Sequence, residues 1–220
     1  MENRLKMIYD SASNLFINKG YARTQIKDIA KEIGLSAGMV YVYFTSKSDI
    51  LRFILKSTID KPFLSQDFEF PVNSELFVSL DKEIIETFEN NIRQFSSHSD
   101  RIADYPLKTM LSDAFDIISE YGVACLIIER NPDDVGKLFD YYKEYRKKFY
   151  AQVLSYIKYY MENGMFRKIE YPEYCTRLIV ETISWWGMHM MNNAFEIRKD
   201  IPRTLAKSVC MDNLIHAYQI

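Results

Sequence analysis

Cysteine and histidine are the residue types most able to bind a metal or to act as nucleophiles, and this chain has three of each. The cysteines are far apart and form no CxxC pair, and the histidines follow no metal-binding or catalytic motif. The residues concerned are Cys125, Cys175, Cys210, His98, His189 and His216. The chain also contains no glycine-rich phosphate loop and no HExxH. We therefore expect no enzymatic activity, no metal site and no cofactor.

An odd number of widely separated cysteines is typical of a reduced cytoplasmic protein that uses thiols as small apolar groups. The N-terminal stretch MENRLKMIYD is charged and lacks the apolar centre of a signal peptide. The most apolar run, ISWWGMHMM at 183–191, is much shorter than the roughly 20 residues of a membrane span. We expect a cytoplasmic protein without a membrane partner.

The stretch GLSAGMVYVYF (34–44) has residue types suited to contact with another molecule. As a helix it places Val40 and Phe44 on one face and its small residues on the other. As a strand it would place Tyr41 and Tyr43 on one face, and its β-branched and aromatic composition favours a strand by propensity alone. Periodicity cannot separate the two structures over so few residues.

The surrounding sequence favours the helix. A lone strand would leave its backbone groups unpaired, and no second strand candidate lies nearby. Ser36 is a good N-cap for a helix from 37, and Thr45-Ser46 followed by Asp49 is a capping pattern for another helix from about Lys47. The sequence therefore predicts a short helix, a turn and a longer helix.

Two more helices precede this stretch. Apolar residues at helical spacing predict the first over roughly 2–18, which Gly20 closes. Thr24 is the predicted N-cap of the second, which ends at Gly34. The apolar positions are Leu5, Ile8, Ala12, Leu15 and Phe16 in the first helix, and Ile26, Ile29, Ala30 and Ile33 in the second.

Two short helices joined by a glycine-containing turn form the layout of a helix-turn-helix, which exposes its second helix for the major groove of DNA. The small residues Ala37 and Gly38 would let the backbone approach DNA, and the hydroxyl of Tyr41 could reach a phosphate. Residues 1–61 carry 10 basic and 6 acidic side chains, whereas residues 62–220 carry 18 and 24. A basic N-terminal part is a reason to look there for an anionic partner.

The stretch TQIKDIAKEIGLSAGMVYVYFTSKSDI (24–50) closely resembles the TetR family of bacterial transcriptional regulators. The resemblance covers about 50–60 residues. It implies an all-α protein with a three-helix helix-turn-helix DNA-binding head at 1–61, its motif at about 25–44, and a larger helical ligand-binding and dimerisation domain at 62–220. The matching positions are Thr24, Ile29-Ala30, Gly34-Leu35-Ser36, Gly38, Tyr41-Val42-Tyr43-Phe44 and Ser46-Lys47.

The resemblance implies that Thr24, Tyr41, Tyr43 and Lys47 hold the DNA backbone, with Lys47 at a helix start that favours phosphate. Structural alternatives stay open for these side chains. Thr24 can be a plain cap, Tyr43 can belong to the packing, and Lys47 can be an ordinary solvated lysine. Ser36, also a candidate contact, can likewise be a plain cap.

We expect the bases to be read by Gln25, Ala37, Gly38, Met39 and Val42. The predicted recognition helix has no arginine, asparagine or lysine for bidentate bonds to bases. Readout then depends on apolar contacts with thymine methyl groups, with Gln25 as the main polar reader. We therefore expect an operator that is rich in A·T at the contacted positions.

The remaining chain reads as long helices, including those at 81–95, 134–163 and 174–198. The resemblance implies a symmetric homodimer through the last two, with heads about 34–36 Å apart to meet successive major grooves. An aromatic and methionine-rich lining predicts a pocket for an unidentified small apolar or amphipathic effector. Ordinary core packing is the alternative for each of its residues, which are Tyr105, Phe115, Trp185, Trp186, Met188 and His189.

Trp185 and Trp186 cannot share one helix face, so one is expected to face the core and the other the dimer seam. The reading that accounts for the whole sequence is a dimeric, ligand-responsive repressor that binds an operator. The alternative is a helical small-molecule-binding or interaction module of the same fold that does not bind an operator.

Overall fold

The computed structural model describes residues 2–194 and 201–220. In this part of the chain, turns connect the helices. Two isolated β-bridges also form within these residues, but no sheet does. The predicted all-α fold is therefore confirmed. None of the described helices combines the length and the apolar character that crossing a membrane requires.

The chain divides into two compact units, and each is built from separate parts of the sequence. The first unit contains the residues up to Thr87 together with Val123–Asp140. The second contains Phe88–Gly122 and Tyr141–Ile220. In this division, residues 62–87 and 123–140 group with residues 1–61. The boundary between a head at 1–61 and a domain at 62–220 stays a prediction.

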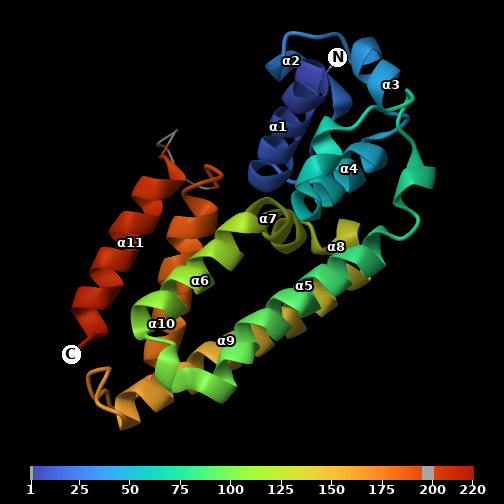
Figure 1. The fold of residues 1–220 in the computed structure, drawn as a ribbon. Helices are drawn as coiled ribbons and strands as arrows, with labels where there is room; N and C mark the ends of the chain where they lie inside the picture. The colour runs from blue at the N-terminus through green and yellow to red at the C-terminus, as the bar shows by residue number, and fades with distance from the viewer. Residues whose placement is uncertain (1, 195–200) are drawn as a thin grey trace. The chain divides into compact units, whose positions relative to one another are not determined.

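The first unit begins with the four helices that the sequence predicts (Figure 1). The apolar stripe of the first helix is buried at Leu5, Ile8, Ala12 and Phe16, as its spacing indicates. After the fourth helix, short 3₁₀ turns lead to the start of a long helix. The elements are α1 (Glu2–Asn18), α2 (Ile26–Glu32), α3 (Ala37–Tyr43), α4 (Lys47–Ile59), η1 (Lys61–Ser65), η2 (Ser74–Phe77) and α5 (Leu80–Ser96).

The stretch with strand-like composition is a helix that ends in extended backbone. Ser36 caps α3 by accepting the amide of Met39 at 3.2 Å. Phe44 then adopts φ −137° and ψ 136° and forms a parallel bridge with Val72. The β-branched and aromatic residues thus serve a short helix and the single extended residue that follows it.

The predicted N-cap of α2 is wrong by one residue. The cap is Gln25, whose amide donates to Asp28 Oδ2 at 2.9 Å. Thr24 instead turns its hydroxyl back to donate to the Gly20 carbonyl at 2.8 Å. A threonine hydroxyl can satisfy a preceding carbonyl in this way, so the residue type alone did not fix the cap position.

The first unit is completed by a segment from the middle of the chain. This segment contains α7 (Gly122–Arg130) except for its first residue, then α8 (Pro132–Val135) and the start of α9 (Lys137–Glu162). The sequence predicts one helix over 134–163. That helix is interrupted because Gly136 adopts φ +58°, a left-handed conformation that breaks helical bonding.

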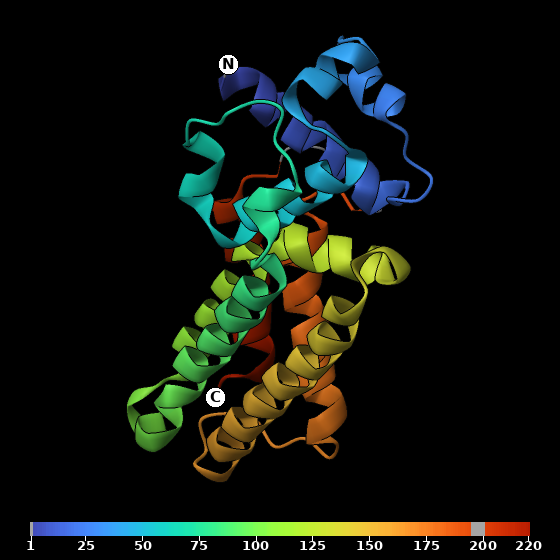
Figure 2. The same ribbon diagram turned by 90° about the vertical axis from the view of Figure 1, so that its right-hand side faces the viewer.

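The second unit is a helical core in which α5 and α9 run in the same direction, side by side (Figure 1, Figure 2). Aromatic pairs join them, including Phe88 with Tyr145 at 4.7 Å between ring centroids and Phe95 with Phe149 at 5.2 Å. The other elements are η3 (Ser97–Asp104), α6 (Leu107–Glu120), α10 (Pro172–Ser184), the single π-helical turn η4 (Trp185–His189) and α11 (Arg203–Tyr218).

The helix predicted over 174–198 begins earlier, and it changes from an α-helix to a π-helical turn. It starts at Pro172, where the missing N–H of proline is tolerated in a first turn, and its α-helical part ends at Ser184. The backbone amide of Met190 then donates to the Trp185 carbonyl at 2.9 Å. This bond joins residues five apart, the spacing of a π turn, and not four apart as in an α-helix. Residues 195–198 of the predicted helix lie outside the described residues.

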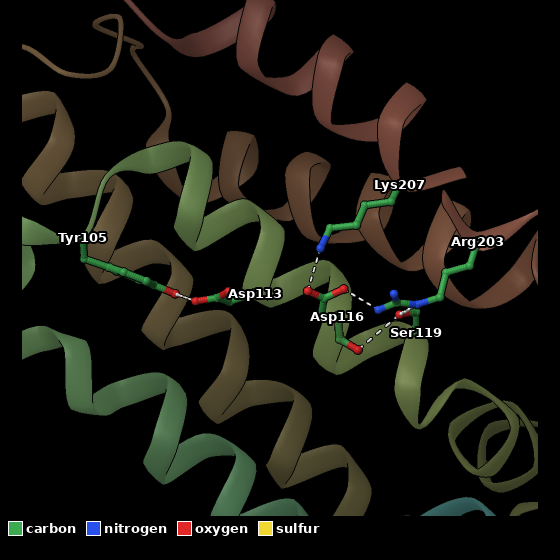
Figure 3. A network of polar contacts seen from close by, with 6 residues as sticks. All are labelled: Tyr105, Asp113, Asp116, Ser119, Arg203 and Lys207. Carbon is green, nitrogen blue, oxygen red and sulfur yellow. Dashed lines mark hydrogen bonds and ion pairs between the residues drawn. The ribbon is translucent and has the colours of Figure 1, made fainter. Parts of the chain in front are cut away.

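Polar contacts tie α11 to α6 (Figure 3). Asp116 on α6 pairs with Lys207 at 2.6 Å and also with Arg203, and Arg203 Nε donates to the Ser119 hydroxyl at 3.1 Å. On the same helix, Asp113 accepts a hydrogen bond from the Tyr105 hydroxyl at 2.8 Å. The contacts of Asp116 and Ser119 hold α11, which the sequence did not single out, against α6, the helix that carries Phe115 of the candidate pocket.

Candidate nucleic-acid interface

Helix α3 turns one face inward and the other to solvent, as its helical register predicts. Val40 and Tyr43 are buried, whereas Tyr41 and Val42 are 51% and 53% exposed. Exposed apolar side chains of this size need an explanation when they lie together on a short helix. The outward face of α3 is therefore available to a partner.

The start of α3 is narrow. Ser36 and Gly38 are exposed, and Ala37 and Met39 are partly exposed. Ser36 acts as the cap and is at the same time accessible, so its two predicted roles do not exclude one another. Ser36, Ala37, Gly38, Met39 and Val42 are thus all at least partly accessible to a partner.

Gln25 lies at the exposed start of α2. Its amide and Lys19 both bind the Asp28 carboxylate, with Lys19 Nζ 2.6 Å from Oδ2. The hydrogen bond from Lys19, followed by that from the Gln25 amide, holds the pKa of Asp28 below its ordinary value. Asp28 is therefore ionised at neutral pH and fixes the first turn of α2.

Two predicted backbone contacts are buried in this structure. Thr24 is 1% exposed, with its hydroxyl directed to Gly20. Tyr43 is 4% exposed and packs edge-to-face against Phe70, with ring centroids 5.0 Å apart. Burial favours the packing role that the sequence left open for Tyr43, and it favours a structural role for Thr24.

Lys47 points back onto the turn between α1 and α2. Its Nζ donates to the carbonyl oxygens of Tyr21 at 2.7 Å and Thr24 at 2.9 Å, and it lies 4.0 Å from the centre of the Tyr21 ring. Burial lowers the pKa of Lys47, and the nearby charge of Asp134 partly offsets this. Lys47 is thus not an ordinary solvated lysine.

The contacts predicted from the sequence do not include several exposed basic residues of the same unit. Lys27 and Lys31 are exposed on α2 and are one helical turn apart. Arg23, before α2, and Arg52, on α4, are also exposed. The signal was present, because the buried positions of α2 at Ile26, Ile29 and Ala30 direct Lys27 and Lys31 outward.

The residues predicted to line an effector pocket fall into two groups within the second unit. Phe115 and Met188 are buried at the contact between α6 and η4, where a Cβ added to Gly187 would lie 3.4 Å from the Phe115 ring. Tyr105 is buried elsewhere on the core. Its ring stacks on His98 at 4.0 Å, and burial followed by the bond to Asp113 raises the pKa of its hydroxyl.

The two tryptophans point in different directions, as expected. Trp186 packs against the core of the second unit. Trp185 is exposed and stacks on His189, with ring centroids 5.1 Å apart. Whether Trp185 meets a second subunit stays a prediction.

Comparison with known proteins identifies the helix-turn-helix. Residues 8–53 match the family model of bacterial regulatory proteins of the tetR family. The helix-turn-helix head of this chain is therefore of the TetR type. The match begins within α1, covers α2 and α3, and ends within α4, so it includes the exposed face of α3 described above.

Relatives among curated proteins support the same assignment. The uncharacterised HTH-type transcriptional regulator YuxN of Bacillus subtilis (strain 168) is 41% identical over 63 residues, which are 29% of this chain and 22% of that protein. The HTH-type transcriptional regulator HbdR of Aromatoleum sp. (strain CIB) is 42% identical over 60 residues, or 27% of this chain and 26% of that one. The chain therefore spans only about a quarter of the length of these curated relatives.

One solved structure extends the likeness in fold to nearly the whole chain. The ketosteroid transcriptional regulator KstR2 of Mycobacterium tuberculosis aligns over 99% of this chain and 95% of its own, with a TM-score of 0.52 and 15% identity. At this identity the likeness concerns the fold alone. The helices after the head thus share the fold of that regulator.

Proposed function

We propose that this protein is a transcriptional regulator that binds an operator as a homodimer and releases it when a small apolar or amphipathic molecule binds. The head matches DNA-binding regulators in sequence over the helix-turn-helix. The most direct support from this chain itself comes from Gly38.

Gly38 lies within a seven-residue helix, where glycine costs about 0.5–1 kcal/mol relative to alanine. Its φ is not positive, and a Cβ added there would meet Ser36 Oγ at 3.8 Å, which is an ordinary contact. Nothing in the described fold therefore requires a glycine at this position. A small residue on an exposed recognition helix suits close approach to a DNA groove.

The exposed cations around α3 suit contact with the phosphates that flank the groove. Lys27 and Lys31 lie on the first helix of the helix-turn-helix, the element that crosses the DNA backbone in such motifs. Arg23 and Arg52 lie before and after it in the same unit. These side chains add phosphate contacts to those that the resemblance assigned to Tyr41 and Lys47.

We propose that the homodimer forms through α10 and its neighbours. Tyr174 and Leu178 are 77% and 59% exposed. Trp185 follows Leu178 by seven residues and so lies on nearly the same face of the helix. A stripe of large apolar side chains on a long helix is suited to a second, identical helix around a twofold axis. The sequence-predicted interface at 134–163 and 174–198 includes this stripe, which lies on its second helix.

We place the effector at the contact of α6 with η4. The two helices meet there through aromatic and methionine side chains, which suit an apolar ligand. A π turn is an irregular helical geometry that occurs frequently at functional sites. An effector would release DNA by having different affinities for two arrangements of the dimer.

The test is selection of binding sites from random duplexes, followed by anisotropy titration of the selected duplex and a scrambled one at two salt concentrations. We expect a palindromic, A·T-rich site whose binding weakens steeply with salt. Tyr41→Phe, which removes one exposed hydroxyl, should weaken binding, whereas Tyr43→Phe is the buried control and should not. Equal, weak binding to both duplexes would contradict operator recognition, and a G·C-rich selected site would contradict the apolar readout.

A further inference from the structure

Asn131 is a buried polar residue that joins two distant parts of the first unit. It lies between α7 and α8 and is 4% exposed. Its side-chain nitrogen donates to the carbonyl oxygens of Ile127 at 2.8 Å and Phe16 at 3.2 Å. Its side-chain oxygen accepts the backbone amide of Tyr21 at 2.6 Å. Asn131 thus bridges the end of α7, the end of α1 and the turn that follows α1.

The same turn is held from its other side by Lys47. Asn131 binds the amide of Tyr21, and Lys47 binds its carbonyl oxygen at 2.7 Å. The Tyr21 ring packs edge-to-face on Phe16 at 5.1 Å. Gly20, at φ +95°, supplies the left-handed conformation that brings the chain between these partners.

The turn sets the start of the helix-turn-helix. Tyr21 is four residues before Gln25, the cap of α2 and a predicted base reader. Thr24, between them, gives its carbonyl to Lys47 at 2.9 Å. Lys47 binds the carbonyl oxygens of both Tyr21 and Thr24. A shift of Tyr21 therefore moves the start of α2 and the side chain of Lys47 together.

Asn131 is also at one end of a helix whose other end meets the candidate effector region. Helix α7 follows α6 after a single residue, Tyr121. At its first residue, Gly122, an added Cβ would lie 3.3 Å from Met188 Cγ and 3.0 Å from Asn192 Nδ2. A nine-residue helix is stiff enough to carry a displacement from one end to the other.

We propose that Asn131 is the positioning residue through which α7 controls the DNA-binding helix-turn-helix. With its three hydrogen bonds intact, the 19–24 turn is fixed and α2 and α3 are presented for DNA. Displacement of α7 withdraws the side chain from Tyr21 and releases the turn. The inference rests on the proposed DNA-binding function.

The test compares Asn131→Ala with Thr58→Val in the full-length protein. Thr58 is buried in the same unit and donates to the Ile54 carbonyl at 2.9 Å, away from the 19–24 turn. Both variants lose buried hydrogen bonding, but only Asn131→Ala frees the Tyr21 amide. Deuterium exchange of residues 19–24 is measured without DNA, and affinity is measured for the selected operator at several salt concentrations.

We expect exchange in 19–24 to rise about tenfold and operator affinity to fall about tenfold in Asn131→Ala, the effect of roughly one lost buried hydrogen bond. The dependence of affinity on salt should not change, because no phosphate contact is removed. Thr58→Val should leave exchange and affinity near wild type. Unchanged exchange in Asn131→Ala, or faster exchange with full affinity, would overturn the proposal.

A measurement on the wild-type protein covers the case in which Asn131→Ala does not fold. Coupling between two sites is reciprocal, so operator binding should slow exchange at residues 127–135 as well as in α2 and α3. Protection confined to the helix-turn-helix would overturn the coupling. If the wild type selects no operator, the proposed function and its coupling both fail, and exchange in Asn131→Ala still decides whether Asn131 holds the turn.

Discussion

The ammonium group of Lys47 donates to the carbonyl oxygen of Tyr21 at 2.7 Å and lies 4.0 Å from the centre of the Tyr21 ring. A lysine that the family resemblance assigns to DNA phosphate is thus engaged within the protein, on the turn that leads into the helix-turn-helix. The contact is local in space but spans 26 residues of sequence. Lys47 can hold the turn or bind a DNA phosphate, and these two roles lead to different predictions.

Lys47→Ala should lower operator affinity and also destabilise the protein by about 1–2 kcal/mol, because two carbonyl oxygens lose a charged donor. The dependence of affinity on salt separates the roles. If Lys47 holds phosphate in the complex, the slope of log affinity against log salt falls in magnitude by about 0.9 for each head. If Lys47 only clamps the turn, affinity falls at every salt concentration and the slope is unchanged. Anisotropy titrations at four salt concentrations and a urea unfolding curve provide both quantities.

Gly38→Ala should separate stability from binding. Because the site has room for a Cβ and lies in a helix, the variant should be more stable by about 0.5–1 kcal/mol. Operator affinity should fall at the same time, because the added methyl group stands on the face that approaches DNA. Thermal unfolding and operator titration of the same sample measure the pair.

Gly34→Ala is the matched control for this glycine. Gly34 has φ +66°, so alanine there is strained and should destabilise the head. Loss of stability in Gly38→Ala, or full operator affinity in that variant, would contradict a DNA-facing role for Gly38.

Leu178→Asp tests the proposed dimer surface. The side chain is 59% exposed in the single chain, so a charged residue there should leave the fold intact. In a dimer the same change would bury a carboxylate near its symmetry mate and should shift the protein to monomer. Sedimentation equilibrium and far-ultraviolet circular dichroism measure the assembly and the fold. Leu205→Asp, at another exposed leucine on α11, shows whether the effect is specific to α10. A dimer that persists in Leu178→Asp would place the interface elsewhere.

The ion pair between Lys56 on α4 and Glu83 on α5 gives a prediction for pH. The atoms Nζ and Oε2 are 2.7 Å apart, and the hydrogen bond from Lys56 is the main cause that lowers the pKa of Glu83. A carboxyl group with a lowered folded-state pKa stabilises the protein above its unfolded-state pKa, and this contribution is lost as pH falls through the folded-state value.

Lys56→Met should therefore reduce the free energy of unfolding by about 0.5–1 kcal/mol at pH 7, a small amount because the pair is partly exposed. The difference from wild type should vanish at acidic pH, once Glu83 is protonated. Urea unfolding at pH 7 and pH 3 measures it. Lys82→Met is the control, because Lys82 pairs with Glu86 at an exposed site, 3.6 Å apart. A difference between Lys56→Met and wild type that persists at pH 3 would show that the loss comes from packing.

Much of the head could be read from the sequence because its signals are local. The apolar spacing of α1, the cap at Ser36 and the cap at Ser46 each depend on residues within one or two helical turns. The inward and outward faces of α3 followed from the same spacing once a helix was chosen over a strand. The error at Thr24 is of the same local kind, since its hydroxyl can bond either forward to an amide or back to a carbonyl.

What only the tertiary structure decided is which side chains meet across long stretches of sequence. Asn131 lies 110 residues from the Tyr21 amide that it binds, and no spacing in the sequence links the two. The burial of Tyr43 depends on Phe70, and the orientation of Lys47 depends on a turn more than 20 residues before it. The sequence determined the helices and their apolar faces, because backbone hydrogen bonding and solvent exclusion act along a helix. Packing between helices decided which polar groups stay exposed and which are bonded within the fold, because a buried donor or acceptor must find its partner wherever the chain brings one.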